Sequence, residues 1–304
     1  MSELYTSVKV EGYTEGYVKV LGYWIFFKSF GEPKKGNILC LHGGPGAGHD
    51  AHSHRMAKLS EDGYRVILYD QLGCGKSDQP QNQTLYTVER YAEEVEGIRV
   101  GLGLDKIHLY GHSWGGMLNV AYAVKYSANL KSLLVSSGTC STPLCAAEMW
   151  RLRGELPKEL QATLNRYEAE GEYSNDEYLR AVDQVYKMHV CRLDPWPPVF
   201  KSMVERKRLG SPGYVYRLMW GPNEFFPVGT LRYWDVTSQL HQINAPTLIT
   251  CGRYDEVTPR NGEVLKQGIK NSKFVIFEKS SHLPMLEEPE RYLEVYRGFL
   301  ESAR

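Results

Sequence analysis

Short apolar runs recur along the chain up to about residue 135 and again from about residue 247, and each has the length and β-branched content of a strand buried on both faces of a sheet. Segments with helical patterning lie between them, and the last of these starts with a proline, which suits a first helical turn. This alternation predicts a mostly parallel α/β sheet with helices on both of its faces. The expected strands are residues 37–41, 65–69, 106–110, 130–135, 247–251 and 273–277, and the expected helices are residues 88–101, 116–126, 260–269 and 289–302.

The alternation stops near Gly138 and resumes near Pro246. The residues between them are rich in charged helical patterning and in tryptophan, tyrosine and proline. We therefore expect a helical cap at residues 139–239, inserted into a core that residues 1–138 and 240–304 form. A second domain with a function of its own is the alternative, but no Gly/Ser-rich or proline-rich linker separates the segment.

Composition and charge narrow the classes of function. The 304 residues are 42% hydrophobic, which is enough to bury one large core. Lys+Arg and Asp+Glu both number 36, so the net charge is zero and no basic stripe favours nucleic acid or a membrane surface. The expected partner is a small or roughly neutral molecule.

The amino terminus has no signal-peptide pattern, and no apolar run is long enough to span a membrane, so we expect a cytoplasmic protein. The six cysteines are scattered without a C-x-x-C pair or zinc-finger spacing. We interpret them mainly as small buried apolar residues, and a disulfide is possible but not indicated.

The stretch GHSWG, from Gly111 to Gly115, matches the pattern G-x-S-x-G and lies between an expected strand and an expected helix. In such a turn the serine is held in a strained conformation, and glycines flank it because side chains there would collide with neighbouring backbone. The sequence therefore predicts that Ser113 is a nucleophile. An ordinary glycine-rich strand-to-helix turn is the alternative.

A serine nucleophile needs a histidine base and a carboxylate that orients the base, and in this chain order the acid precedes the histidine. Asp255 follows the expected strand 247–251, and His282 follows the expected strand 273–277. Carboxyl ends of parallel strands meet at one edge of a sheet, where α/β sites lie. We expect Ser113, Asp255 and His282 to form a catalytic triad there.

Acyl transfer also needs donors for the oxyanion. The backbone N–H of Trp114 is one candidate by position. The glycine-rich loop LHGGPGAGH follows the first expected parallel strand, and its Gly44 N–H is the second candidate.

This chemistry requires neither a metal nor an organic cofactor, and we expect none. A competing interpretation is a zinc site formed by a dense group of imidazoles and a carboxylate. That group is His49, Asp50, His52 and His54.

Five stretches together resemble the proline iminopeptidase family of α/β-hydrolases, and the similarity extends over nearly the whole chain. The resemblance implies an α/β-hydrolase core with a helical cap and release of an N-terminal residue, often proline, from short peptides. It also implies docking to a larger protease, as in some archaeal members. The stretches are HGGPG at 42–46, DQLGCGKSD at 70–78, GHSWGG at 111–116, GRYDEVTP at 252–259 and SSHLPMLEEPE at 280–290.

The resemblance further implies two acidic residues that bind the free amino group of the substrate. The stretch MWGPNEF matches the cap motif of the family and points to Glu224, and the residue after the triad aspartate is Glu256. Paired carboxylates suit an ammonium in a partly closed pocket.

The pocket for the first substrate residue stays unassigned. Three aromatic residues near Glu224 could line it or could be part of the cap core, so a broader preference for apolar first residues is open. They are Trp220, Phe225 and Phe226.

Two other functions are compatible with this sequence. A serine esterase, lactonase or amidase would use the same triad without recognising an amino terminus. A non-catalytic binding protein of this fold is disfavoured because Ser113, Asp255 and His282 are all present.

Overall fold

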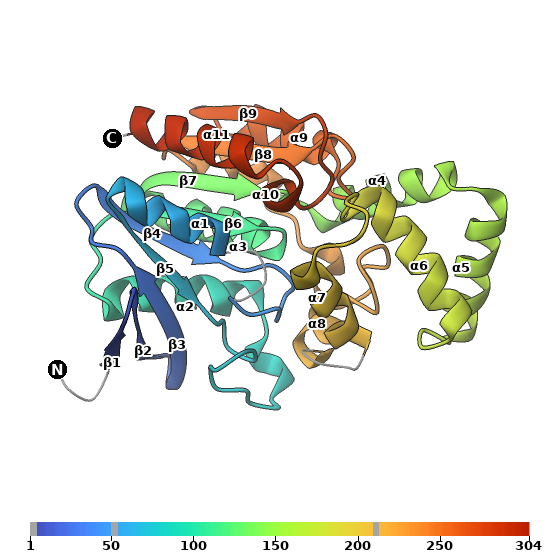
Figure 1. The fold of residues 1–304 in the computed structure, drawn as a ribbon, viewed down its shortest axis with the longest axis horizontal. Coiled ribbons are helices and arrows are strands. Elements are labelled where there is room, and N and C mark those ends of the chain that lie inside the picture. Colours follow the sequence, from blue (N-terminus) through green and yellow to red (C-terminus); the bar gives the residue numbers. More distant parts are fainter. Residues whose placement is uncertain (1–4, 50–53, 209–212, 304) are drawn as a thin grey trace.

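The computed structural model describes residues 5–49, 54–208 and 213–303, and one sheet dominates them (Figure 1). Its strands are ordered β1-β2-β3-β5-β4-β6-β7-β8-β9, and the last six strands in this order, from β5 to β9, run parallel to one another. All six expected strands are confirmed, each within two residues of its expected ends. They are β4 (Gly36–Leu41), β5 (Tyr64–Tyr69), β6 (Ile107–His112), β7 (Leu130–Ser136), β8 (Thr247–Gly252) and β9 (Ser272–Phe277).

Three further strands at the amino terminus were not expected from the sequence. They are β1 (Tyr5–Val10), β2 (Tyr13–Val20) and β3 (Tyr23–Phe30), and they form an antiparallel meander that joins β5 through β3. Most side chains of β1 and β2 are exposed or half-buried, so these two strands lack the continuous apolar run typical of a strand buried on both faces, whereas β3 does contain such a run at its start. The loops between these strands are two residues long and end in Gly12 and Gly22, which both have positive φ. Such glycine-ended loops are the sequence feature that indicates the hairpins.

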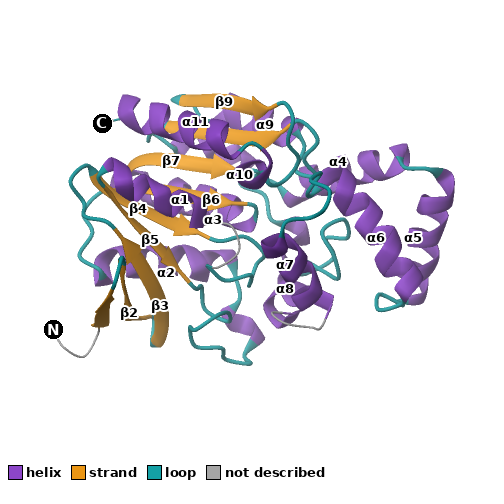
Figure 2. Cartoon of the chain, viewed as in Figure 1, coloured by secondary structure: helices purple, strands orange, loops and turns teal. Residues whose placement is uncertain are grey.

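Helices cover both faces of the sheet, so the predicted α/β class is confirmed (Figures 1 and 2). In the view of Figure 1, α1 and α11 lie in front of the sheet and α2 and α3 behind it. The core helices are α1 (His54–Ala57), α2 (Val88–Gly101), α3 (Trp114–Tyr126), α9 (Pro259–Gly268), α10 (Pro284–Glu287) and α11 (Pro289–Ser302), with short 3-10 turns at η1 (Lys58–Asp62), η2 (Gln83–Leu85) and η3 (Ser127–Asn129).

A separate group of helices lies between β7 and β8 in the chain and beyond the carboxyl ends of the parallel strands in space (Figure 1). We call this group the cap helices. They begin where the strand–helix alternation of the sequence stops, and they contact one another and helices of the core. The segment contains α4 (Thr142–Glu155), α5 (Lys158–Glu170), α6 (Asp176–His189), α7 (Pro198–Arg208), α8 (Gly213–Met219), η4 (Thr230–Tyr233) and η5 (Thr237–Gln242).

Of the three strands that lead to Ser113, Asp255 and His282, β6 and β8 are deeply buried and β9 is mostly half-buried. Every residue of β6 and β8 is buried. All six cysteines are buried free thiols, as expected. Across the described ranges, no helix combines the length and the apolar character needed to cross a membrane.

Candidate active site

Ser113 occupies the turn between β6 and α3 in a conformation that non-glycine residues rarely adopt. Its φ and ψ angles are 57° and −122°. The backbone is crowded on both sides: a Cβ on Gly111 would lie 2.0 Å from the Gly115 carbonyl oxygen, and a Cβ on Gly115 would lie 2.3 Å from that of Leu41. The two glycines allow the close approach, and the turn projects Ser113 beyond the edge of the sheet.

Asp255 and His282 meet at the same edge, on the loops that follow β8 and β9. Oδ1 of Asp255 lies 2.7 Å from Nδ1 of His282, and both side chains are buried. The same carboxylate oxygen accepts the backbone N–H of Val257 at 2.8 Å, which fixes its orientation. His282 and Ser113 line one common cavity. The structure therefore brings the three residues of the expected triad together.

The second imidazole nitrogen of His282 is directed to another acid. Its Nε2 lies 3.7 Å from Oε1 of Glu256, a distance typical of an ion pair. No hydrogen bond joins Ser113 Oγ to His282 in the part of the chain that the structure describes. Burial lowers the pKa of His282, but Asp255, Glu256 and Glu224 outweigh that effect and raise the pKa to about 9.

Residues that the sequence did not single out hold the His282 loop in place. The His282 carbonyl accepts Nε2–H of His112 at 2.8 Å and the Ser137 hydroxyl at 3.3 Å. Glu287 accepts the backbone N–H and the hydroxyl of Ser281 at 2.7 and 2.8 Å. The acidic end of SSHLPMLEEPE therefore orients the loop, a role that the spacing of the motif does not reveal.

The two expected oxyanion donors are held together by Gln71, which the sequence also did not identify. Gly44 and Trp114 line one cavity with Ser113. The Gln71 side chain accepts the indole N–H of Trp114 at 2.8 Å and donates to the His42 carbonyl at 3.3 Å. This buried amide thus links the turn that contains Ser113 to the loop that contains Gly44.

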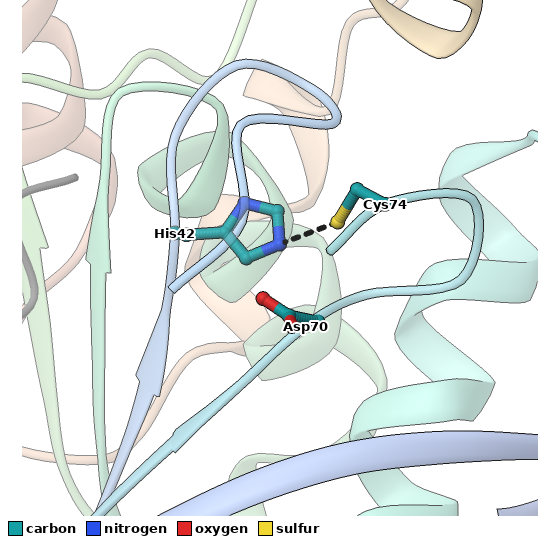
Figure 3. A group of neighbouring side chains, drawn as sticks. All are labelled: His42, Asp70 and Cys74. Atoms are coloured by element: carbon teal, nitrogen blue, oxygen red, sulfur yellow. Dashed lines mark hydrogen bonds between the residues drawn. The ribbon is translucent and has the colours of Figure 1, made fainter. Parts of the chain in front are cut away.

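Three side chains near the Gly44 loop carry atoms that could coordinate a metal. They are His42, Asp70 and Cys74, and they lie side by side (Figure 3). Their atoms already have hydrogen-bond partners. Nε2 of His42 accepts the backbone N–H of Gln71 at 3.1 Å and faces the Cys74 thiol at 3.3 Å. Asp70 accepts backbone N–H groups of His49 and Lys76 at 2.8 and 2.9 Å. We interpret this group as a network that supports the Gly44 loop.

The competing zinc hypothesis concerned residues near His49. Asp50 and His52 lie outside the described residues, as does the His54 side chain. His49 itself is buried, and its Nδ1 pairs with Oδ1 of Asp70 at 2.8 Å. Within the described ranges, His49 thus belongs to the network under the Gly44 loop.

Two cavities open beside Ser113, and Glu224 lines both of them. The first has a volume of about 320 Å³, and Glu256 also lines it. The second, of about 380 Å³, contains His282. Glu224 reaches this position from the loop after α8, where its carbonyl accepts the Trp220 indole N–H at 3.1 Å. The structure therefore places both acidic residues implied by the family resemblance beside the serine.

The walls of the first cavity are mainly apolar. Of the three aromatic residues considered from the sequence, Trp220 lines this cavity, whereas Phe225 packs inside the cap near Tyr186 and Phe226 packs near Trp150. The other apolar residues of the wall are Trp114, Met117, Cys145, Met149 and Val257.

The comparisons with known proteins agree with this architecture. Residues 36–172 match the model of the alpha/beta hydrolase fold. The chain is 43% identical to a proline iminopeptidase of Saccharolobus solfataricus, over 98% of this chain and 97% of that protein. It is 42% identical to one of Thermoplasma volcanium, over 95% and 97% of the two chains.

Solved structures show the same relationship. The crystal structure of VinJ superposes with a TM-score of 0.90 at 37% identity, over 95% of this chain and 99% of that one. A proline iminopeptidase from Mycobacterium smegmatis gives 0.86 at 33% identity, over 95% and 98%. Fold and site thus define an α/β-hydrolase of the serine-peptidase class. Within that class, the chain belongs to the proline iminopeptidase family.

Proposed function

We propose that this enzyme releases the first residue, proline or another apolar residue, from short peptides through an acyl-enzyme on Ser113. The observation that carries the proposal is the position of Ser113. It lies at the wall of two cavities. The carboxylates of Glu224 and Glu256 line the first cavity, and His282, which pairs with Asp255, lines the second. The names of the relatives support the same activity.

In the proposed reaction, Ser113 attacks the carbonyl carbon of the first residue while Nε2 of His282 takes the hydroxyl proton. Asp255 holds the imidazole through Nδ1. The backbone N–H groups of Trp114 and Gly44 stabilise the developing oxyanion. His282 then protonates the leaving amine, and water repeats the sequence to hydrolyse the acyl-enzyme.

The first cavity suits the first residue of the peptide. Its apolar wall fits a pyrrolidine or other apolar side chain, and Glu224 and Glu256 supply negative charge for the ammonium. The second cavity, which His282 lines, suits the leaving part of the peptide. Docking to a larger protease stays a prediction from the family resemblance.

The test compares release of aminomethylcoumarin from its Pro, Ala and Phe amides and from the N-acetylated forms of each. We expect strong cleavage of the free-amine substrates and at least a hundredfold slower cleavage of the acetylated ones. Pro should be preferred because its ring fills the apolar cavity. The Ser113→Ala variant should lose all turnover above background.

Glu224→Gln provides a second check. Its carboxylate contacts a group that is charged in both ground and transition states, so KM for Pro-aminomethylcoumarin should rise by about tenfold or more with a smaller change in kcat. Equal cleavage of acetylated and free substrates would instead indicate an esterase or amidase without amino-terminus recognition.

A further inference from the structure

The imidazole of His282 lies between two acidic side chains, one at each nitrogen. Asp255 lies 2.7 Å from Nδ1 and Glu256 lies 3.7 Å from Nε2. The exposed fractions of the three side chains are 6%, 0% and 2%, so water screens these charges little. Nε2 is the nitrogen that must take the Ser113 proton. Glu256 therefore lies beside the imidazole nitrogen that takes part in the proton transfer.

Charged and titratable groups face this imidazole from three directions. Asp255 and Glu256 come from the loop after β8, and Glu224 comes from the cap. The His112 ring, at the end of β6, lies with its centroid 4.8 Å from that of His282, and its Nε2–H is donated to the His282 carbonyl. The three carboxylates all favour a proton on Nε2.

A protonated His282 cannot accept a proton from serine. Burial lowers the pKa of His282, and the carboxylates more than reverse that effect and raise it to about 9. In this structure Nε2 lies within ion-pair distance of Glu256. An ammonium bound at Glu224 and Glu256 would compensate their charge and remove most of their effect on Nε2.

We propose that Glu256 holds His282 in its protonated, paired form in the free enzyme and that the ammonium of the incoming peptide releases the base by taking over this carboxylate. The inference rests on the proposed function, since it requires a substrate with a free amino group. As the ammonium binds, the Nε2 proton leaves to water. The neutral Nε2 then takes the Ser113 proton during attack.

This coupling makes recognition of the amino terminus part of the chemical step. An N-acetylated peptide loses the ammonium contact and also meets a protonated base. Discrimination against it therefore extends to kcat, beyond what binding alone provides.

The test uses a neutral probe that needs no amino-group binding. Phenylmethanesulfonyl fluoride reacts when the serine oxygen attacks sulfur, fluoride leaves and the serine proton passes to Nε2 of His282. Inactivation of the unaltered enzyme should rise with pH toward about 9, because His282 must lose its proton first. Glu256→Gln should shift this rise to lower pH by at least about one unit, which makes inactivation at pH 7 about tenfold faster.

The same variant should hydrolyse Pro-aminomethylcoumarin with a lower kcat/KM, so the two reactions move in opposite directions. Glu148→Gln is the matched control: this carboxylate accepts the Thr258 hydroxyl at 2.8 Å at the junction of cap and core, and its removal should leave the pH profile of inactivation unchanged. An unshifted profile in Glu256→Gln, or slower inactivation at every pH, would overturn the proposal.

A second measurement needs no variant. In the unaltered enzyme, kcat for Pro-aminomethylcoumarin depends on the protonation of His282 while the ammonium is bound. The rise of kcat with pH should therefore lie at least about one pH unit below the rise of the inactivation rate. If kcat and the inactivation rate rose over the same pH range, the coupling would be refuted, but the aminopeptidase assignment would stand. Equal cleavage of acetylated substrates would reject the assignment itself, whatever the sulfonylation profile.

Discussion

At the residue scale, Gln71 has a structural role that the sequence did not indicate. It lies in the stretch DQLGCGKSD, which contributed to the family resemblance but suggested no chemistry. Its buried amide joins Trp114 to the His42 carbonyl and so connects the two segments that carry the proposed oxyanion donors. Such support matters because a donor displaced by about 1 Å loses much of its effect on the transition state.

Gln71→Leu should lower kcat by about tenfold to a hundredfold and change KM by less than about threefold, because the oxyanion contacts strengthen only in the transition state. Steady-state kinetics with Pro-aminomethylcoumarin measure this split. Trp114→Phe keeps the backbone donor and removes the indole partner, and adding it to Gln71→Leu should cost little more. Additive losses in the double variant would show that Gln71 does not act through Trp114.

At the scale of elements, the turn from β6 to α3 combines strain with tight packing. The sequence predicted both the turn and its nucleophile because G-x-S-x-G between a strand and a helix has a definite backbone geometry. The conformation of Ser113, with φ of 57°, costs a non-glycine residue about 1–3 kcal/mol. The hydrogen bond of its backbone N–H to the Ser136 carbonyl, at 2.9 Å, helps to hold the turn in place.

Ser113→Gly should therefore be more stable than Ser113→Ala by about 1 kcal/mol, and we expect both variants to be inactive. Both substitutions remove the hydroxyl, so the difference between their free energies of unfolding measures the cost of the backbone conformation at this position. Urea unfolding followed by circular dichroism gives the two free energies of unfolding. An alanine variant as stable as the glycine variant would mean that the turn stores little strain.

The amino-terminal meander is the part of the sheet that the hydrophobic pattern did not predict. The residues of β1 are largely exposed, and those of β2 are mostly half-buried. Continuous apolar runs identify strands buried on both faces. They do not identify partly exposed strands such as β1 and β2, whose formation depends on pairing with a neighbouring strand more than on their own side chains.

At the scale of the whole molecule, the cap segment supplies part of the walls of both cavities beside Ser113, and a buried ion pair helps to hold its helices together. Arg153 and Glu168 pair at 2.7 Å, and each side chain is only 6% exposed. The Tyr178 hydroxyl also donates to Glu168, at 3.1 Å. The pair links α4 to α5.

Glu168→Leu should destabilise the protein by about 3–5 kcal/mol, because it leaves the Arg153 guanidinium buried without its counter-ion. Replacing both residues with leucine should recover most of that loss, since no unpaired charge remains. Urea unfolding monitored by circular dichroism, with residual peptidase activity beside it, measures both effects. A single variant as stable as the unaltered enzyme would show that water reaches Arg153.

The sequence by itself determined the α/β core and the order Ser113, Asp255 and His282, because strand periodicity and short motifs depend on residues close together in the chain. The tertiary structure alone decided the contact of Glu256 with Nε2 of His282 and the link that Gln71 makes. These contacts join residues from different loops, and their distances depend on how packed strands and helices position those loops. Local sequence patterns do not determine such distances, so the position of the His282 imidazole between two carboxylates is evident only in the folded chain.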